Sequence, residues 1–500
     1  MKNLLLIICS VFALNINAQY TKLHDFDSIN GSQPMGSLMQ ATDGMLYGMT
    51  SNGGTSNNGV IFKYNPTTST YTKNLDFATT GTSGSIAGSF SQGTLMQASD
   101  GMLYGMSYAG GGVSGGGCGS GGCGVLFQYN PTTNVYTKKF DFADTNGANP
   151  YGSLMQATDG MLYGMTNQGG TGGTCIDGCG VLFQYNPATS IHTKKLDFAG
   201  TTNGSYPKGS LMQASDGMLY GLMPGGGTSS ICWGGCGVLF QYNPATNTYT
   251  KKLDFDSING RGPAGSLMQA SDGMLYGMTS GGGASTNCSN IGCGVLFQYN
   301  PATNVYTKEL DFTGATNGQY PIGNLMQASD GMLYGMSVDG GVSGGSCGSG
   351  GCGVLFQYNP ATNVYTKKFD FAGTGATIDG SNPNGSLIQA SDGMLYGMTS
   401  VGGANGKGVL FKFGISSTTA IQTHNQAGVN IFSYGNAIKT NGTIPQGTQL
   451  KVINTLGQVV LTTALQNNIE TNLPSGIYTI QVIDTMGSII EIKKCALINN

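Results

Sequence analysis

Short apolar runs alternate with polar and glycine-rich stretches along most of the chain, and residues 265–312 show the pattern in full. The runs occupy residues 265–271, 274–279, 294–299 and 305–312. Runs of this length, bounded by Gly, Asn, Asp and Pro, predict β-strands. Asp272-Gly273 separates the first two runs, and we expect a tight hairpin with both residues at positive φ. The stretch therefore predicts four antiparallel strands, of which the more polar fourth is an outer edge.

An Asp-Gly-Met-Leu-Tyr-Gly motif recurs along the chain. Its copies begin at Asp43, Asp100, Asp159, Asp216, Asp272, Asp330 and Asp392. A period of roughly 60 residues indicates repeated units that bury their apolar faces against one another. The second strand of each unit is apolar on both faces, as in the middle of a packed sheet. We predict an all-β chain with a seven-bladed β-propeller over residues 19–414.

The two ends of the repeat region favour a closed ring over an open solenoid, the alternative that needs polar caps. The seventh repeat runs through residues 408–413 and then lacks a fourth strand. Residues 20–26 carry the missing strand at the other end of the region. Pairing these two segments would remove the one unpaired edge, so we predict closure by the N-terminal strand.

Composition excludes several classes of protein. Gly accounts for 85 of the 500 residues and charged residues for 9%, yet apolar residues make up 39%. Such a chain is too apolar to be disordered, and it lacks the Gly-X-Y register of collagen. The formal net charge of −3 provides no basic field for nucleic acid.

The first 18 residues are typical of a secretory signal peptide. Lys2 precedes an apolar run over residues 4–14, and we expect cleavage after Ala18. The run is too short to cross a bilayer, and no later stretch is long enough, so no transmembrane segment is predicted. An exported protein can oxidise its cysteines.

Five loops between the second and third strands, those of repeats two to six, are longer than the other two, and only these carry cysteine pairs. The pairs are Cys118/Cys123, Cys175/Cys179, Cys232/Cys236, Cys288/Cys293 and Cys347/Cys352. Because each pair arrives with its own insertion, we predict five local disulfides. Zinc is the alternative, which would need two loops to pool their cysteines without a nearby His.

Candidate catalytic groups are sparse, and we predict no catalytic, metal or cofactor site. His24 and His192 fall in fourth strands, where we expect exposed side chains, and His424 lies in the tail, none beside a distinctive nucleophile. Turn chemistry explains the aspartates of the Asp-Gly motif. A second recurring aspartate precedes the Phe that ends each repeat, as in Asp311-Phe312, and we expect it to bind backbone donors between repeats.

The variable loops bring aromatic and polar residues towards one face of the predicted propeller. The candidate ligand-binding residues are Trp233, Tyr108, Tyr206, Tyr320, Asp177, Asp339 and Arg261, with Tyr151 nearby. Aromatic and polar side chains on Gly-rich loops suit sugar or peptide recognition. Arg261 is the single arginine of the chain, which excludes the arginine cluster of a sialidase.

The repeat resembles the GloVer (Gloeo/Verruco) tandem repeat of secreted bacterial proteins. The shared features are the Asp-Gly-x-Leu-Tyr-Gly core, the Gly-Gly loop, the Val-Leu-Phe-Gln-Tyr strand and the closing Asp-Phe, over roughly residues 20–414. The resemblance implies a propeller-like repeat and an exported protein, without a settled activity.

The repeat pattern stops after Gly414, where residues 415–422 are typical of a linker. Short alternating strands over residues 423–500 then predict a small β-sandwich. This tail resembles the C-terminal sorting domain of type IX secretion in Bacteroidota, through Asn454-x-Leu-Gly-Gln458, Leu473-Pro-Ser-Gly-Ile-Tyr478 and Lys493-Lys494. The resemblance implies the type IX machinery as a partner and an extracellular or outer-membrane surface location.

The sequence leaves three hypotheses about function. The first is a non-catalytic module that binds glycan or protein through its disulfide-clipped loop face. The second is a secreted polysaccharide hydrolase or lyase that uses aspartates of that face. The third is a structural surface protein without a small ligand.

Overall fold

The computed structural model describes residues 19–77, 86–112, 118, 121–285, 287–288, 291–341, 347, 350–372, 379–415, 430–434, 437–441, 447–454, 458–474, 476–485 and 489–497. The predicted signal peptide, residues 1–18, and residues 416–422 of the predicted linker lie outside these residues. The chain divides into two compact units, Met1–Ile415 and Ser416–Asn500. Among the described residues, every named element is a β-strand, which confirms the prediction of an all-β chain.

The described part of the first unit contains seven four-stranded antiparallel sheets of one pattern, here sheets 1 to 7. In order within each sheet, the strands are β2 (Met39–Gln40), β3 (Leu46–Met49), β4 (Val60–Asn65) and β5 (Thr70–Asp76) in sheet 1; β7 (Met96–Gln97), β8 (Leu103–Ser107), β10 (Val125–Asn130) and β11 (Val135–Asp141) in sheet 2; β12 (Met155–Gln156), β13 (Leu162–Thr166), β14 (Val181–Asn186) and β15 (Ile191–Asp197) in sheet 3; β16 (Met212–Gln213), β17 (Leu219–Met223), β18 (Val238–Asn243) and β19 (Thr248–Asp254) in sheet 4; β20 (Met268–Gln269), β21 (Leu275–Thr279), β22 (Val295–Asn300) and β23 (Val305–Asp311) in sheet 5; β24 (Met326–Gln327), β25 (Leu333–Ser337), β26 (Val354–Asn359) and β27 (Val364–Asp370) in sheet 6; and β28 (Ile388–Gln389), β29 (Leu395–Thr399), β30 (Val409–Phe413) and β1 (Tyr20–Asp25) in sheet 7. A two-stranded sheet of β6 (Ile86–Ser89) and β9 (Ala109–Gly111) is added beside sheet 2.

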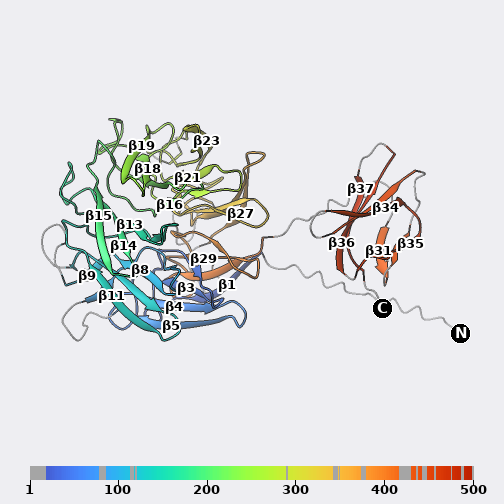
Figure 1. The fold of residues 1–500 in the computed structure, drawn as a ribbon, viewed down its shortest axis with the longest axis horizontal. Helices are drawn as coiled ribbons and strands as arrows, with labels where there is room; N and C mark the ends of the chain where they lie inside the picture. Colours follow the sequence, from blue (N-terminus) through green and yellow to red (C-terminus); the bar gives the residue numbers. More distant parts are fainter. Residues whose placement is uncertain are drawn as a thin grey trace. The chain divides into compact units, whose positions relative to one another are not determined.

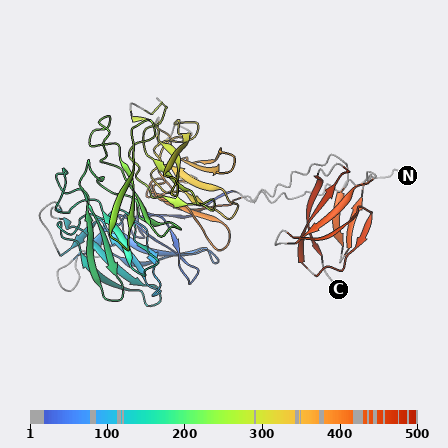
Figure 2. The ribbon, with the colours of Figure 1, turned by 45° about the horizontal axis from the view of Figure 1, so that its top comes forward.

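The sheets follow one another around a centre in chain order, and the orange strands of sheet 7 lie beside the blue N-terminal strand (Figures 1 and 2), where β1 pairs with β30. Four-stranded antiparallel sheets packed face to face in this way make the unit propeller-like. The first strand of each sheet is only two residues long, shorter than the seven-residue run that the sequence predicts. The second strand is buried along its whole length, as predicted.

The glycine inside each second strand is required by packing. At Gly277, an added Cβ would lie 2.6 Å from Phe297 Cζ and 2.9 Å from Leu267 Cδ2. Because real Cβ atoms essentially never come so close to a neighbour, the aromatic ring of the third strand can cover the second strand only where that strand has no side chain. The glycine therefore makes room for the Phe of the Val-Leu-Phe-Gln-Tyr strand.

The Asp-Gly turn differs from the predicted two-residue hairpin. Gly44 has a φ of 79°, but Asp43 is not at positive φ. The N–H of Gly44 donates to the carbonyl of Ala41, and that of Ala41 donates to the carbonyl of Met45, each at 2.9 Å. The turn is thus a longer loop that ends in one left-handed glycine. The Asp43 carboxylate instead accepts from the Met45 N–H at 3.0 Å and the Tyr47 hydroxyl at 2.8 Å, so its role is structural.

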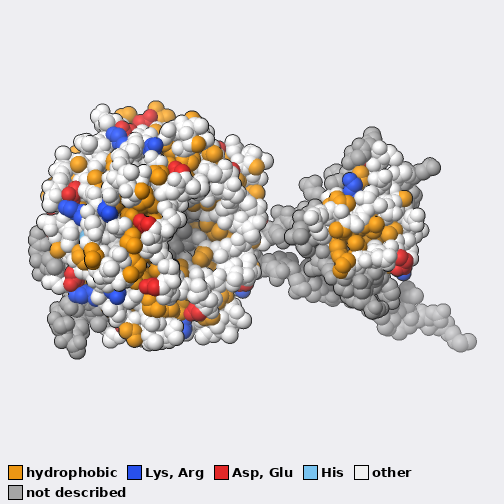
Figure 3. Space-filling view, in the orientation of Figure 1, with side chains coloured by type: hydrophobic (Ala, Val, Ile, Leu, Met, Phe, Trp, Pro, Cys, Tyr) orange, Lys and Arg blue, Asp and Glu red, His pale blue; other side chains and the backbone are white. Residues whose placement is uncertain are grey.

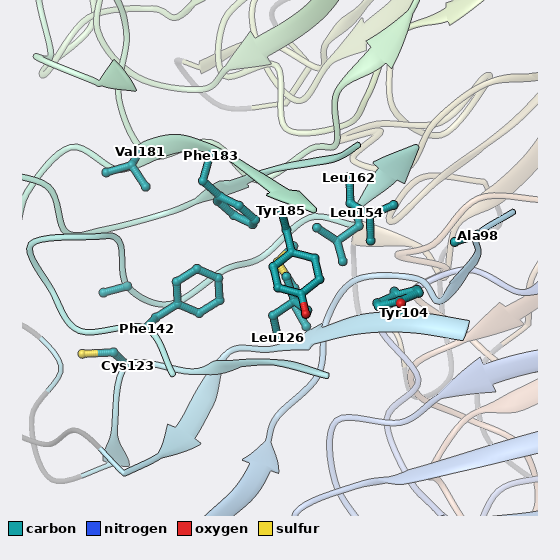
Figure 4. Close-up of a cluster of buried hydrophobic side chains, with 12 residues drawn as sticks. Ala98, Tyr104, Cys123, Leu126, Phe142, Leu154, Leu162, Val181, Phe183 and Tyr185 are labelled. Carbon is teal, nitrogen blue, oxygen red and sulfur yellow. The ribbon is translucent and has the colours of Figure 1, made fainter. Parts of the chain in front are cut away.

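Each sheet packs against the next through a cluster of fully buried apolar side chains. Figure 4 shows one such cluster, in which Tyr104 and Leu126 of sheet 2 meet Leu162, Phe183 and Tyr185 of sheet 3. Equivalent clusters join the other successive sheets. Each large side chain buried in this way stabilises the fold by about 1.5–3 kcal/mol.

The N-terminal strand β1 is an integral part of sheet 7. It pairs antiparallel with β30, with Tyr20 opposite Phe413 and Asp25 opposite Val409. The Phe26 N–H donates to the carbonyl of Gly408 at 3.0 Å, and the Phe26 ring is fully buried in a cluster that joins sheet 7 to sheet 1. The predicted pairing of residues 20–26 with residues 408–413 is therefore observed.

The second unit holds two sheets. A three-stranded sheet has β31 (Asn430–Tyr434), β32 (Ala437–Asn441) and β35 (Asn468–Glu470), and a four-stranded sheet has β34 (Val459–Ala464), β33 (Gln449–Ile453), β36 (Gly476–Ile483) and β37 (Ile489–Leu497). Ile438 and Ile469 of the first sheet share one core with Leu450, Ile480 and Val482 of the second. No helix in the described part of the chain has the length and apolar character needed to cross a membrane.

The burial of Phe26 yields a test of the role of β1. We expect Phe26→Ala to lower the free energy of unfolding by about 3–5 kcal/mol, because it empties a fully buried aromatic site. Phe142→Ala is the matched control, since Phe142 is also fully buried and follows the outer strand of sheet 2. Urea denaturation should give similar losses for both variants. A much smaller loss for Phe26→Ala would mean that β1 is peripheral.

Candidate ligand-binding face

The five cysteine pairs form disulfides, and this prediction is confirmed. Their Cα–Cα distances are 4.8–5.2 Å, each within the loop between the second and third strands of sheets 2 to 6. The carbonyl of the second cysteine then accepts an N–H from the following sheet, as from Tyr206 to Cys179 and from Tyr320 to Cys293, both at 3.0 Å. Each disulfide therefore closes a loop whose backbone is hydrogen-bonded to the segment that leads into the next sheet.

The second cysteine of each pair is buried, so each disulfide reaches from its loop into the core. These cysteines are at most 2% exposed, and they pack in the apolar clusters between successive sheets. Each precedes a glycine and the valine that begins the third strand, so its sulfur enters the core together with that strand. They are structural residues of the sheet interfaces and are not available to a ligand. The buried cysteines are Cys123, Cys179, Cys236, Cys293 and Cys352.

One residue before each sheet corresponds to those that donate an N–H to the carbonyl of the second cysteine. The backbone of all seven has the left-handed conformation. The residues at this position, here the strained position, are Gln33, Phe90, Asn149, Tyr206, Gly262, Tyr320 and Asn382, with φ between 53° and 59°. Tyrosine and phenylalanine rarely adopt this conformation. All but Phe90 precede a proline, and the residue before a proline is normally extended. Such strain persists only where surrounding contacts impose it, and it is frequent at binding sites.

A ring of hydrogen bonds surrounds the centre of the sheets, a few residues further along each repeat. The Ser153 N–H donates to Ser210 Oγ at 2.7 Å, and the Ser386 N–H donates to Ser37 Oγ at 2.7 Å, from sheet 7 to sheet 1. The same bond links all the other successive sheets. The glycine before each of these residues touches the next one so closely that any Cβ would collide with a backbone carbonyl.

This ring lines an axial cavity of about 140 Å³. The residue directly before each ring glycine also lines it, and we call these residues the rim. They are Met35, Gln92, Tyr151, Lys208, Ala264, Ile322 and Asn384. All seven differ, although the Gly-Ser, Gly-Thr or Gly-Asn that follows hardly varies. Of the seven, only Tyr151 is named from the sequence above; the signal for the others is that this position varies when the seven repeats are aligned.

A groove of about 460 Å³ adjoins the cavity over sheets 1 to 3 and shares Met35, Gln92 and Tyr151 with it. Amides from Gln33, Asn52, Asn149 and Gln168 and the rings of Phe90 and Tyr108 complete most of its lining. Figure 3 shows one face of the first unit, which is hollowed near its centre and on which the charged side chains are scattered among uncharged surface. Aromatic faces with amide groups can hold a polar ligand.

Tyr108 is the predicted residue that the structure brings into this groove, beside Tyr151. The two rings meet edge to face with centroids 5.8 Å apart, and Lys208 Nζ lies 5.5 Å from the centroid of Tyr151. Burial raises the pKa of the Tyr151 hydroxyl, and Tyr108 adds to the shift. The hydroxyl is therefore a neutral donor at physiological pH.

The other predicted residues do not converge. Trp233 is fully exposed, and it lines neither the cavity nor the groove. Asp177 lies in a separate depression of its own disulfide loop, with Asp144 and Thr171. Tyr206 lies in the loop that leads into sheet 4, and Arg261 packs its stem against Gly281.

Tyr320, in the loop between sheets 5 and 6, and Asp339, in the loop of sheet 6, each bind a loop of an adjoining sheet. The Tyr320 hydroxyl donates to the Cys288 carbonyl at 3.1 Å. Asp339 Oδ1 accepts from Asn382 Nδ2 at 3.1 Å, and burial raises the pKa of the Asp339 carboxyl, while that hydrogen bond opposes the shift. These side chains are occupied by protein contacts.

The prediction that the recurring aspartates at the ends of the outer strands bind backbone donors of a neighbouring sheet is wrong, because they bind N–H groups of their own sheet. Asp76 accepts from the Thr55 N–H at 3.1 Å and pairs with Lys73 at 2.9 Å, all within sheet 1. The outer strand ends beside the second loop of its own sheet, which places that loop's N–H groups within reach. Ion pairs that remain in contact with solvent contribute little to stability.

The two strand histidines are not exposed, contrary to expectation. His192 stacks on Phe140 of sheet 2 with centroids 4.0 Å apart and on Phe183 at 5.0 Å. His24 stacks on Tyr71 of sheet 1 at 3.9 Å. Burial lowers the pKa of both, that of His192 to about 4. They are packing residues at sheet interfaces, because an imidazole can replace an aromatic ring there.

The model of the Gloeobacter/Verrucomicrobia repeat matches residues 9–176, 171–344 and 286–460, which together cover most of the chain. The chain belongs to this repeat family. A comparison with curated protein sequences found no match to this chain.

Solved structures resemble the repeat protein only distantly. An oligogalacturonate lyase in complex with manganese has 11% identity and a TM-score of 0.48, over 80% of this chain and 93% of that chain. An oligogalacturonate lyase from Vibrio parahaemolyticus has 11% identity and a TM-score of 0.49, over 80% and 94%. A GH74 enzyme from Niastella koreensis has 13% identity and a TM-score of 0.49, over 96% and 67%. Similarity at this level carries no information about activity.

The low pKa of His192 predicts acid sensitivity. The imidazole of His192 binds a proton at about pH 6.5 in the unfolded chain and only at about pH 4 in the folded protein. The contribution of this residue to stability is therefore present above pH 6.5 and is lost as the pH falls to 4. In His192→Tyr, which restores the tyrosine of other repeats, the unfolding free energy should fall less over this range in urea titrations.

Tyr249→His is the matched variant, because Tyr249 holds the same position in sheet 4. It should become more acid-sensitive than the parent. Equal slopes for parent and His192→Tyr between pH 6.5 and 4 would contradict the assignment.

Proposed function

We propose that this repeat-family protein is an exported, closed, seven-bladed β-propeller that binds a ligand on its loop face without transforming it. Closure is supported by the hydrogen bond from Ser386 to Ser37 and by the cluster around Phe26, each of which joins sheet 7 to sheet 1. The disulfides agree with an oxidising compartment outside the cytoplasm.

One observation carries the binding proposal: the rim position differs in all seven repeats although its neighbours hardly vary. If the rim served only the scaffold, one residue type would meet the same need in every sheet. Diversity at a position that lines a cavity is instead what recognition of an asymmetric ligand requires. The rim is therefore the centre of the binding face.

The groove favours a glycan over a protein as the ligand. Its lining of tyrosine, phenylalanine and amide side chains offers flat apolar surfaces beside hydrogen-bonding groups, which match the faces and hydroxyls of sugar rings. The groove adjoins a cavity and is not a broad apolar patch of the kind that protein partners cover.

The alternative of a secreted hydrolase or lyase has less support. Glycoside hydrolysis in most families uses two carboxyl groups that flank the scissile bond. Asp177 and Asp339 belong to loops of sheets 3 and 6, which are separated by two other sheets. A purely structural role is the third possibility, and it would leave the diversity of the rim unexplained.

We further propose that residues 423–500 form a β-sandwich sorting domain that directs type IX secretion to the cell surface or medium. The two sheets with one shared core support the sandwich, and the resemblance of the tail supports the route. The signal peptide would take the chain across the inner membrane first.

Glycan binding is tested with the full chain on an array of surface polysaccharides. We expect at least one glycan to bind, and Tyr151→Ala to weaken that binding about tenfold or more through loss of an aromatic contact. Trp233→Ala is the control, since this exposed residue lies outside the cavity and groove. A loss with Trp233→Ala alone would move the site to the loop tip, and a clean negative array would favour the structural role.

Secretion is tested by deletion of residues 423–500 in a host with a type IX system. We expect the truncated protein to accumulate in the periplasm, and the parent to reach the surface or medium. Cell fractionation with immunoblotting measures both. Efficient release of the truncated protein would refute the sorting role.

A further inference from the structure

The rim carries a single charge. Among the described residues that line the axial cavity, Lys208 is the one charged side chain. It is exposed, and the ion pairs of the described residues do not include it. Most other lysines of the first unit lie on outer strands, where seven of them pair with the aspartate three residues later. Lys208 is thus a cation directed to a cavity without a protein counter-charge.

The ammonium of Lys208 is held in place by an aromatic ring. It lies 5.5 Å from the centroid of Tyr151, which lines both the cavity and the groove. A cation–π contact of this kind restricts the long side chain before a ligand arrives. Such preorganisation reduces the entropy that binding must overcome.

The remaining groups of the cavity favour a single negative charge surrounded by hydroxyl groups. The backbone N–H groups of the ring already donate to the side chains of the next sheet, as from Ser153 to Ser210. They are not available to cradle a phosphate, which usually needs several N–H donors. The serine hydroxyls can each still donate a hydrogen, and Gln92 adds an amide.

We propose that the axial cavity binds a carboxylate-bearing sugar residue, a uronic acid, through Lys208. This inference rests on the proposed glycan-binding function and names its ligand class. The cavity of about 140 Å³ is small compared with the roughly 300–1,000 Å³ of sites that enclose a drug-sized ligand. One acidic residue occupies it, and the adjoining units of the chain lie against Tyr108 and Phe90 in the groove.

The test compares one oligosaccharide with and without its charge. Calorimetry on the full chain uses oligogalacturonate, its methyl ester and a neutral galactan of the same length. We expect the acid form to bind at least about tenfold more tightly than the ester, as for a charge-assisted hydrogen bond. Lys208→Met, which keeps the length of the side chain, should abolish that difference and the salt dependence of binding.

Lys195→Met is the matched control, because it removes an equal charge from the outer strand β15; it should leave binding unchanged. If parent and Lys208→Met bind acid and ester equally, glycan binding stands and the acidic class is wrong. If no glycan binds, the proposed function itself fails. A peptide with a free C-terminal carboxylate serves as a second probe, and its preferred binding over every uronate would also overturn the proposal.

Discussion

The close contact of backbones around the axis is the constraint on which the rest of the structure depends. The ring glycines, such as Gly152 and Gly209, leave no space for a side chain between one first strand and the next. The serine, threonine or asparagine that follows accepts an N–H from the preceding sheet. This spacing brings the buried Tyr and Phe side chains of successive sheets into contact, and it also sets the width of the cavity that the rim lines.

The scaffold and the binding face use different positions of the same repeat. Asp43 and Tyr47 exemplify the scaffold, since their hydrogen bond recurs in all the sheets and holds a turn. The rim and the strained position lie on the loops between the fourth strand of one sheet and the first of the next, where residue types vary. Disulfides between cysteines four residues apart connect the neighbouring loops to the core. They restrict the conformations open to these glycine-rich loops.

Prediction from sequence succeeded where the physics is local and repeated. Periodic apolar runs located the strands, and the spacing of Cys175 and Cys179 located a disulfide, because both depend on residues close in the chain. It failed for His192, since a partly polar strand residue is judged exposed unless the aromatic ring from the neighbouring sheet is known. It also favoured Trp233, which is conspicuous by type but is fully exposed and lines neither the cavity nor the groove.

The amino-acid sequence by itself determined that this protein is all-β, that it is built from seven similar units, and that residues 20–26 supply the strand that the last unit lacks. These features follow from hydrophobic period, turn residues and spacing, which need no knowledge of distant contacts. Only the tertiary structure decided which loop residues meet. Lys208 and Tyr151 stand 57 positions apart and become neighbours because seven sheets direct the same position of each repeat to one axis.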